Sequence, residues 1–139
     1  MTQYPFRLIN VFAESALAGN ALCVFEDARG LSGEAMQALA RQFNLSETTF
    51  LLPSQSADAR VRIFSPAAEF PFAGHPTLGS AAVVRQLRSL GRELTLEMPA
   101  GIIPVQCGSD HYTLQAGAAT SWRRCWGWRP MRSPGGRSW

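Results

Sequence analysis

The sequence predicts a single α+β domain, in which a curved and mostly antiparallel sheet holds a helix. Three observations predict this class. The 139-residue chain is 46% hydrophobic and 17% charged, which is typical of a globular protein with one core. Two segments repeat apolar residues at helical spacing, and about seven shorter ones are rich in β-branched residues or alternate in polarity. The connections between these shorter segments are short, which favours antiparallel pairing.

The first elements expected are a strand, a turn and a buried strand, over residues 6–12, 18–20 and 21–25. An amphipathic helix is expected next, over residues 33–43, because apolar side chains recur there every three or four positions. Ser32 is the expected N-cap of this helix, and Asn44 is its expected end.

The rest of the predicted domain consists of further strands and a second helix. The strands are expected over residues 48–53, 59–63, 93–98, 102–107 and 111–115, the last two as a hairpin. The helix is expected over residues 76–89, because the ring of Pro76 suits a first helical turn, where no N–H is lost. Its apolar side chains spread around most of the circumference, so we expect it to be buried on several sides.

Charge is distributed unevenly along the chain. Residues 1–121 contain eight arginines and ten acidic residues, whereas residues 122–139 contain five arginines and no acidic residue. The body therefore has no cluster of basic residues of the kind that binds nucleic acid. No apolar run approaches the roughly 18 residues of a membrane span, and the start of the chain lacks a signal-peptide pattern. We therefore expect a cytoplasmic protein with neither nucleic acid nor membrane as a partner.

The end of the chain differs in character from the rest. Residues 119–139 hold all four tryptophans and are otherwise rich in Arg, Gly, Pro and Ser, without helical or strand periodicity. A shifted reading frame through GC-rich sequence produces such a segment. We therefore expect a domain over residues 1–118 and an aberrant, disordered tail over 119–139. The alternative is a tail that binds a membrane or RNA through charge and stacking.

The basic and sulfur-containing residues limit the available chemistry. The chain has thirteen arginines and no lysine, which excludes Schiff-base and lysine general-base catalysis within this chain. Cys23 and Cys107 lie in apolar, strand-like segments and are expected to be buried structural thiols, with Cys125 as the third cysteine. Three scattered cysteines form neither a zinc site nor a disulfide framework, so no metal site is expected.

Two motifs carry candidate chemistry. The segment 44–50 places Glu47 where the first helix gives way to an apolar strand. The segment 69–79 places a Gly-His-Pro turn at the start of the second helix. A carboxylate that exchanges a proton, close to helix amides that bind an anion, can move hydrogen on a small acid.

In their order and spacing, these segments resemble the phenazine-biosynthesis isomerase family, the PhzF-like proteins, which share the diaminopimelate-epimerase fold. The resemblance covers residues 5–117. It rests on Asn10-Val11-Phe12, Gly19-Asn20, Met36-Gln37 with Arg41, Asn44 to Phe50, Arg62 to Pro66, and Glu69 to Gly79.

The resemblance implies a longer, two-domain protein, of which this chain is the N-terminal half. Each half would be a mixed β-barrel around a central helix, with the active site between the halves. It also implies an isomerase without metal or organic cofactor, in which a glutamate removes a proton from one carbon of a small carboxylate and returns it to another. Relatives on this fold racemise amino acids with two thiols, but residues 72–75 contain no thiol, which places the sequence on the carboxylate branch.

By motif, Glu47 would be the proton shuttle, and His75 would orient substrate or assist proton movement. The substrate carboxylate would be bound by the start of the second helix and a nearby turn, through Gly74, Pro76, Thr77 and Asn20.

Each of these side chains also has a plainer interpretation. Glu47 could be a turn carboxylate, His75 a helix-end histidine held by backbone, and Asn20 part of a common Gly-Asn turn. Ser65 and Glu69 could flank the same cleft or be solvated ends of strands.

The sequence also departs from the family pattern. Nothing after Ala118 resembles the family's second domain, or the strand that returns to complete the first barrel. Without the opposite wall, Glu47 would face water and lose the desolvation that tunes a catalytic carboxylate. Whether this chain is an enzyme by itself therefore stays open. The alternative to a truncated isomerase is a non-catalytic fragment or pseudoenzyme that acts only through self-association, for example as a homodimer.

Overall fold

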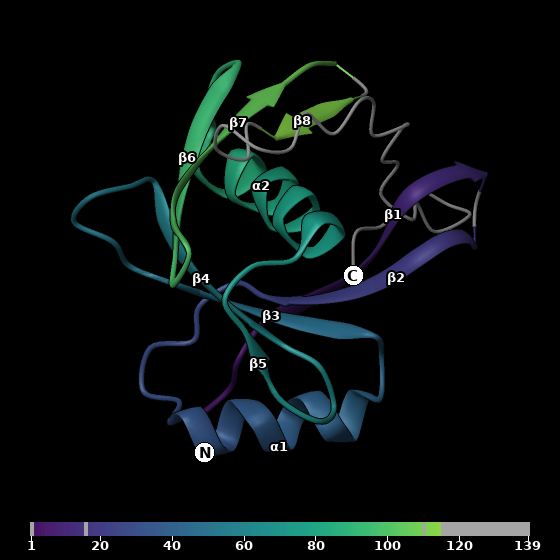
Figure 1. Ribbon diagram of the computed structural model, residues 1–139, viewed down its shortest axis with the longest axis vertical. Coiled ribbons are helices and arrows are strands. Elements are labelled where there is room, and N and C mark those ends of the chain that lie inside the picture. Colours follow the sequence, from purple (N-terminus) through teal and green to yellow (C-terminus); the bar gives the residue numbers. More distant parts are fainter. Residues whose placement is uncertain (1, 16, 110, 115–139) are drawn as a thin grey trace.

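The computed structural model describes residues 2–15, 17–109 and 111–114, which form an α+β domain (Figure 1). These described residues contain, in order, β1 (Phe6–Ser15), β2 (Ala18–Phe25), α1 (Gly33–Phe43), β3 (Glu47–Leu52), β4 (Ala59–Phe64), β5 (Glu69–Phe70), α2 (Gly74–Arg88), β6 (Glu93–Met98), β7 (Gly101–Cys107) and β8 (Tyr112–Leu114). The predicted fold class is confirmed. Ser32 caps α1 by accepting a hydrogen bond from the N–H of residue 35, and Asn44 ends it in the left-handed conformation, both as predicted.

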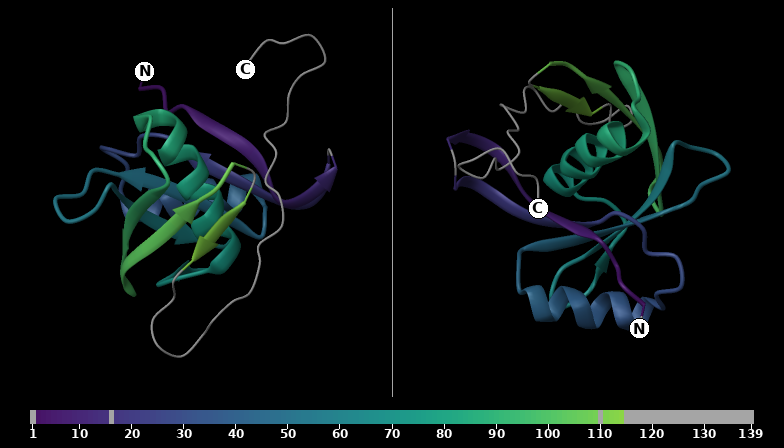
Figure 2. Two further views of the ribbon diagram at one scale, coloured as in Figure 1. Left: turned by 90° about the horizontal axis from the view of Figure 1, so that it is seen from above. Right: turned by 180° about the vertical axis from the view of Figure 1, so that it is seen from behind.

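The strands form one mixed sheet in the order β1-β2-β3-β4-β6-β7-β8, with the short β5 paired to β4. Neighbouring strands are antiparallel except for two parallel pairs, β2 with β3 and β4 with β6. Helices α1 and α2 make the crossovers that parallel neighbours require. The sheet curves around α2 (Figures 1 and 2), and within the described residues it stays open between β1 and β8.

The sheet separates two apolar clusters. The larger cluster lies around α2. The smaller cluster lies between the sheet and α1, on the other face of the strands β1, β2, β3 and β4 (Figure 1). Strand β3 contributes to both, because alternate side chains of a strand point to opposite faces. Leu51 packs in the α2 cluster and Phe50 in the α1 cluster. Thr49 also faces α2, where its hydroxyl accepts a hydrogen bond from the Ser80 hydroxyl at 3.0 Å.

Helix α2 is the central element of the larger cluster. Every residue from 76 to 84 is buried, so the prediction of a helix buried on several sides is confirmed. Gly79 makes this possible, since a Cβ at that position would lie 2.5 Å from Leu22 Cδ2 and 3.0 Å from Ile9 Cδ1. The helix therefore approaches β1 and β2 more closely than a larger residue would permit.

The substitution Gly79→Val is expected to lower the free energy of unfolding by about 2–3 kcal/mol, because the added carbons overpack a filled core. Urea unfolding of the 139-residue chain measures this change. Gly74→Val is the matched control in the same helix, because a Cβ at Gly74 meets no atom within 4 Å. Equal losses in the two variants would show that the close approach at Gly79 does not set the cost.

One local prediction is wrong, and one element is absent from the prediction. Residues 18–20 do not form a turn: β2 begins at Ala18, and Asn20 pairs with Val11 on the strand. A Cβ at Gly19 would lie only 2.8 Å from the Val11 carbonyl oxygen. Glycine is therefore present here because the backbones of β1 and β2 approach each other closely, and not because the chain turns. The two-residue strand β5 is too short to produce a strand pattern.

Cys23 and Cys107 are free and buried, as expected. Burial raises the pKa of the Cys23 thiol to about 12, so this thiol stays protonated and unreactive. Cys125 and the tail expected over 119–139 lie outside the described residues. Neither described helix has the length and apolar character needed to cross a membrane.

Candidate active site

Glu47 and His75 lie against each other at the start of α2. Glu47 is the first residue of β3, and strand alternation puts its side chain on the face of Thr49 and Leu51, which points to α2. His75 is the second residue of α2. Its Nε2 lies 3.2 Å from Glu47 Oε2, and the His75 and Glu47 side chains are 10% and 20% exposed. The packing of α2 on β3 thus brings the two sequence motifs together.

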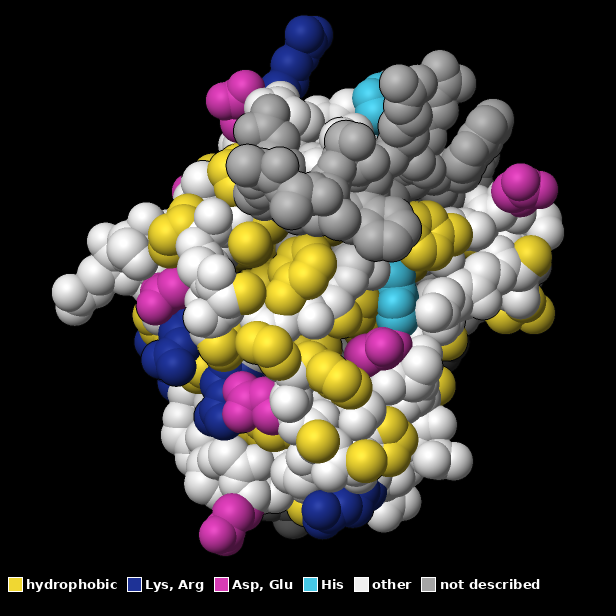
Figure 3. Space-filling view, viewed as in Figure 1, with side chains coloured by type: hydrophobic (Ala, Val, Ile, Leu, Met, Phe, Trp, Pro, Cys, Tyr) yellow, Lys and Arg dark blue, Asp and Glu magenta, His cyan; other side chains and the backbone are white. Residues whose placement is uncertain are grey.

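The two facing atoms of this pair, Glu47 Oε2 and His75 Nε2, are buried, and neither makes a hydrogen bond of normal geometry within the described part of the chain. A buried polar atom without a partner is rare and costs about 1–3 kcal/mol. On the face viewed in Figure 3, a histidine touches an acidic side chain, with hydrophobic side chains close by. The pair therefore has hydrogen-bonding capacity left for a ligand or a transferred proton.

Burial lowers the pKa of His75 below its ordinary value of 6.5, and the Glu47 carboxylate opposes this shift only in part. The imidazole is therefore neutral near neutral pH. In a neutral imidazole one ring nitrogen donates a hydrogen bond and the other accepts one. His75 can thus present either a donor or an acceptor to the site, depending on which nitrogen carries the proton.

Stability is expected to fall in mild acid because of His75. In the unfolded chain the imidazole takes up a proton near its ordinary pKa of 6.5, whereas the folded chain takes it up only at lower pH. Between these two pH values the unfolded state binds more protons than the folded state. The free energy of unfolding therefore decreases as the pH falls through 6.5. Urea unfolding at several pH values should show a shallower decrease for His75→Gln, with His111→Gln as the control. Parallel curves for the original chain and His75→Gln would contradict this assignment.

The start of α2 presents backbone N–H groups that have no partner within the helix. The N-cap, Ala73, offers no side-chain cap, and no acidic residue lies in the first turn. Pro76 has no N–H, while the N–H and hydroxyl of Thr77 donate to the Ala73 carbonyl oxygen at 3.3 and 2.6 Å. The available amides are therefore those of Gly74 and His75, next to open space at Gly74. Such a helix start favours a bound anion. Ligand binding by Pro76 and Thr77 stays a prediction.

Asn20 reaches the same site from β2. Its Nδ2 lies 3.3 Å from His75 Nδ1, and its Oδ1 accepts a hydrogen bond from the Ser46 hydroxyl at 3.0 Å. Ser46 directly precedes Glu47 in the chain. The four side chains therefore form one continuous series, in which Asn20 contacts the imidazole on the side opposite the carboxylate.

Phe12 is a site residue for which the sequence indicates no role. Its φ of 59° is a left-handed conformation that is rare for a bulky residue. It lies where the register of β1 and β2 shifts between Val11 and Ser15. The Phe12 ring is 6.5 Å from the His75 ring between centroids and 41% exposed, so it forms an apolar wall beside the imidazole. No local sequence pattern signals a positive φ at phenylalanine, so sequence reasoning misses this wall.

Ser65 and Glu69 have partners that explain them structurally. Arg62 donates to the two Glu69 carboxylate oxygens at 2.7 and 2.8 Å, and this pair joins β4 to β5. The Ser65 hydroxyl donates within its own turn, to the Ala68 carbonyl oxygen at 3.2 Å. These contacts favour the plainer interpretation of both residues.

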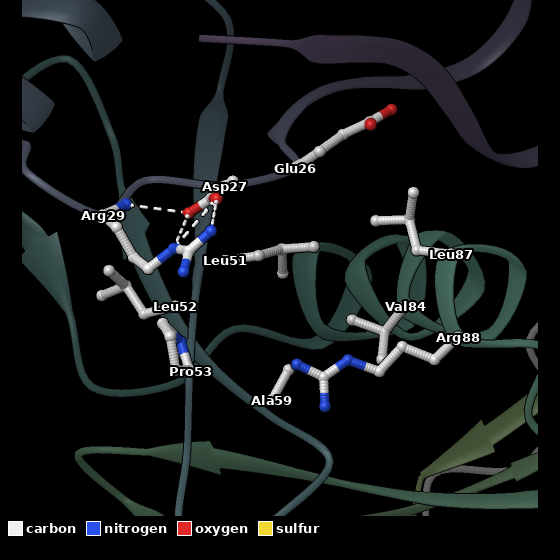
Figure 4. Close-up of a pocket in the computed structure, with 10 residues that line it drawn as sticks. All are labelled: Glu26, Asp27, Arg29, Leu51, Leu52, Pro53, Ala59, Val84, Leu87 and Arg88. Atoms are coloured by element: carbon white, nitrogen blue, oxygen red, sulfur yellow. Dashed lines mark hydrogen bonds and ion pairs between the residues drawn. The ribbon is translucent and has the colours of Figure 1, made fainter.

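A cavity of about 260 Å³ lies at the other end of α2 (Figure 4). It is lined by the segment after β2, the end of β3 and the last turns of α2, including Arg88. Hydrogen bonds from Arg29 lower the pKa of Asp27 in its wall. Since α2 rises about 1.5 Å per residue, roughly 20 Å separate Arg88 from His75. This cavity is therefore not part of the Glu47–His75 site. Among the described residues, no group of three or more His, Cys, Asp or Glu side chains is placed to hold a metal ion.

Comparison with known proteins gives several matches. The family model described as phenazine biosynthesis-like protein (PhzC-PhzF) matches residues 9–133. An uncharacterized isomerase of Pasteurella multocida is 48% identical over 105 residues, which are 74% of this chain and 36% of that protein. The trans-2,3-dihydro-3-hydroxyanthranilate isomerase of Pseudomonas aeruginosa is 50% identical over 102 residues, which are 73% of this chain and 36% of that protein. The chain thus spans just over a third of the length of these two relatives.

Solved structures show the same fold. A PhzF-family phenazine biosynthesis protein of Enterococcus faecalis superposes with a TM-score of 0.75 at 30% identity, covering 81% of this chain and 44% of that one. A hydroxyproline epimerase of Agrobacterium vitis superposes with a TM-score of 0.58 at 16% identity, covering 80% of this chain and 40% of that one. The second likeness concerns the fold alone.

Proposed function

Because this chain belongs to the phenazine biosynthesis-like protein family, we propose that it supplies the glutamate-bearing half of a site for cofactor-independent isomerisation of a small carboxylate. The observation that carries the proposal is the buried pair of Glu47 Oε2 and His75 Nε2, 3.2 Å apart at an uncapped helix start. Two polar atoms with unmet bonding capacity lie next to amides that favour an anion.

In the proposed reaction, Glu47 acts as the base and then as the acid. It removes a proton from one substrate carbon, the double bond of the substrate shifts, and the same carboxyl group returns the proton to a second carbon. The reaction is balanced without an oxidant or a reductant. The substrate carboxylate is held by the amides of Gly74 and His75, which keeps the reacting carbons beside Glu47.

The His75 side chain and Phe12 complete this half of the proposed site. The imidazole lies against the carboxylate and can hydrogen-bond to a substrate hydroxyl or amine. The Phe12 ring, with its centroid 6.5 Å from that of the imidazole, offers an apolar contact to an unsaturated ring. The opposite wall, in this proposal, comes from the part of the longer relatives that this chain does not match.

A chimeric protein tests the proposed function. In this chimera, residues 5–114 of the chain replace the matching segment of the Pseudomonas aeruginosa trans-2,3-dihydro-3-hydroxyanthranilate isomerase, to which the chain is 50% identical over 102 residues. We expect the chimera to isomerise that compound in the absence of any added metal or cofactor. A folded chimera that binds the compound without converting it would contradict the proposal.

Self-association is the second candidate function, and exposed apolar side chains on and next to β1 favour it. Phe12, on β1, is 41% exposed, and Leu17, just before β2, is 79% exposed. Such side chains promote association between copies. Light scattering of the 139-residue chain should then report a dimer, which Phe12→Ser with Leu17→Ser should weaken. A monomer at all tested concentrations would remove this candidate.

A further inference from the structure

Asn20 links three parts of the fold through one amide group. It lies on β2, its oxygen accepts a hydrogen bond from Ser46 just before β3, and its nitrogen faces the imidazole of His75 on α2. Ser46 and Glu47 are adjacent, so one short segment both carries the carboxylate and contacts the amide. The family resemblance implies a substrate-binding role for Asn20, and the structure gives its amide two side-chain partners.

The partners of His75 indicate where its proton lies. An ionised carboxylate only accepts hydrogen bonds, so Glu47 Oε2, 3.2 Å from His75 Nε2, favours a proton on that nitrogen. In the neutral imidazole Nδ1 is then an acceptor and needs a donor. The Asn20 NH₂ group lies 3.3 Å from Nδ1 and can supply it. This assignment of hydrogens follows from the network of partners.

Ser46 contacts the end of the amide that lies away from His75. Its hydroxyl donates to Asn20 Oδ1 at 3.0 Å, which leaves the NH₂ group toward His75. The reversed amide would place an oxygen against Nδ1 and draw the imidazole proton to that side. Nε2 would then face the carboxylate with a lone pair, and the two acceptors would repel each other. While Glu47 is ionised, only the direction with the NH₂ group toward His75 avoids placing two acceptors against each other.

We propose that Asn20 is a positioning residue, which holds His75 as the tautomer with its proton on Nε2, and that Ser46 fixes the direction of the Asn20 amide. Its catalytic meaning rests on the proposed function. In this tautomer His75 donates toward Glu47 and the ligand space, and it does not compete with Glu47 as the acceptor of the substrate proton. Asn20 thus acts through His75, without touching the reacting carbons.

The tautomer can be measured directly in the 139-residue chain by ¹⁵N NMR of labelled histidine rings. The chain has two histidines, so His75→Gln assigns the signals by subtraction. At about pH 7.5, above the ordinary pKa of 6.5 that burial lowers further in His75, we expect Nε2 of His75 to be protonated and Nδ1 to be unprotonated. A proton on Nδ1, or equal occupancy of both nitrogens, would overturn the inference.

Two substitutions and one control test whether Asn20 and Ser46 determine the tautomer of His75. Asn20→Asp keeps the shape but puts a carboxylate against Nδ1, so both ring nitrogens should become protonated at the same pH. Asn44→Asp adds the same charge at the end of α1 and should leave the tautomer unchanged. Ser46→Ala removes the donor to Oδ1 and should give a mixture of tautomers. An unchanged His75 spectrum in both Asn20→Asp and Ser46→Ala would overturn the inference.

The tautomer is measured without turnover, so the proposed function and the role of Asn20 are tested independently of each other. An inactive chimera with the expected His75 tautomer would contradict the proposed function and leave the role of Asn20 intact. An active chimera in which Asn20→Asp alters neither the tautomer nor the pH profile of kcat would contradict the role of Asn20 alone.

Discussion

Replacement of Glu47 by glutamine in the chimera is expected to lower turnover of trans-2,3-dihydro-3-hydroxyanthranilate by about 10²–10⁴-fold, the usual contribution of a general acid–base group. Glutamine keeps the shape of the side chain at the start of β3, but it cannot accept a proton from carbon. The amides of Gly74 and His75 are untouched, so the dissociation constant of the substrate should change little. Steady-state kinetics and calorimetric binding measure the two quantities.

The control for this prediction is Glu14→Gln. Glu14 is an exposed glutamate on β1. Its substitution removes one carboxylate of the same kind and leaves Glu47 and His75 unchanged. It should turn over at the rate of the unchanged chimera. If Glu47→Gln also did so, the assignment of Glu47 as the proton shuttle would be wrong.

The second large effect concerns stability. Phe50→Ala is expected to lower the free energy of unfolding of the 139-residue chain by about 3–5 kcal/mol. Phe50 is completely buried, stacks on Phe25 with ring centroids 4.8 Å apart, and meets Phe64 edge-on at 5.4 Å. Its removal leaves a cavity between the sheet and α1 and breaks both aromatic contacts. Urea unfolding followed by circular dichroism measures the loss.

Phe70→Ala is the matched control, because Phe70 lies on the short β5 and is 40% exposed. It deletes the same atoms from a position where little surface is buried, so its effect should be a small fraction of that at Phe50. Similar losses at both positions would mean that the α1 cluster is not closely packed. Since β3 carries both Phe50 and Glu47, the same packing also fixes the position of the carboxylate.

Local interactions explain which elements could be predicted. Helix α1 has the predicted bounds because its signals are local: Ser32 bonds within the first turn, and Asn44 adopts the left-handed conformation that ends the helix. Helix α2 begins two residues before the predicted start, because Pro76 occupies the third helical position and not the first. The preference of proline for a first helical turn predicts where the helix starts to within a few residues, and the packing of the helix determines the exact residue.

Contacts between distant segments explain what the sequence could not show. Gly19 looks like a turn residue, but the Val11 carbonyl across the sheet makes glycine necessary within a strand. The parallel pairing of β4 with β6 depends on how α2 packs, which no local pattern encodes. The same holds for the site. The motifs point to Glu47 and His75, but the position of Phe12 and the contact between Asn20 and the imidazole exist only in the folded chain.

The most direct test of the account is a crystal structure of the Glu47→Gln chimera with trans-2,3-dihydro-3-hydroxyanthranilate bound. We expect the ligand carboxylate on the amides of Gly74 and His75, and the side chain at position 47 within about 3.5 Å of the carbon that loses its proton. A ligand held in the cavity beside Arg88, or a side chain at position 47 directed away from the bound ring, would contradict the account.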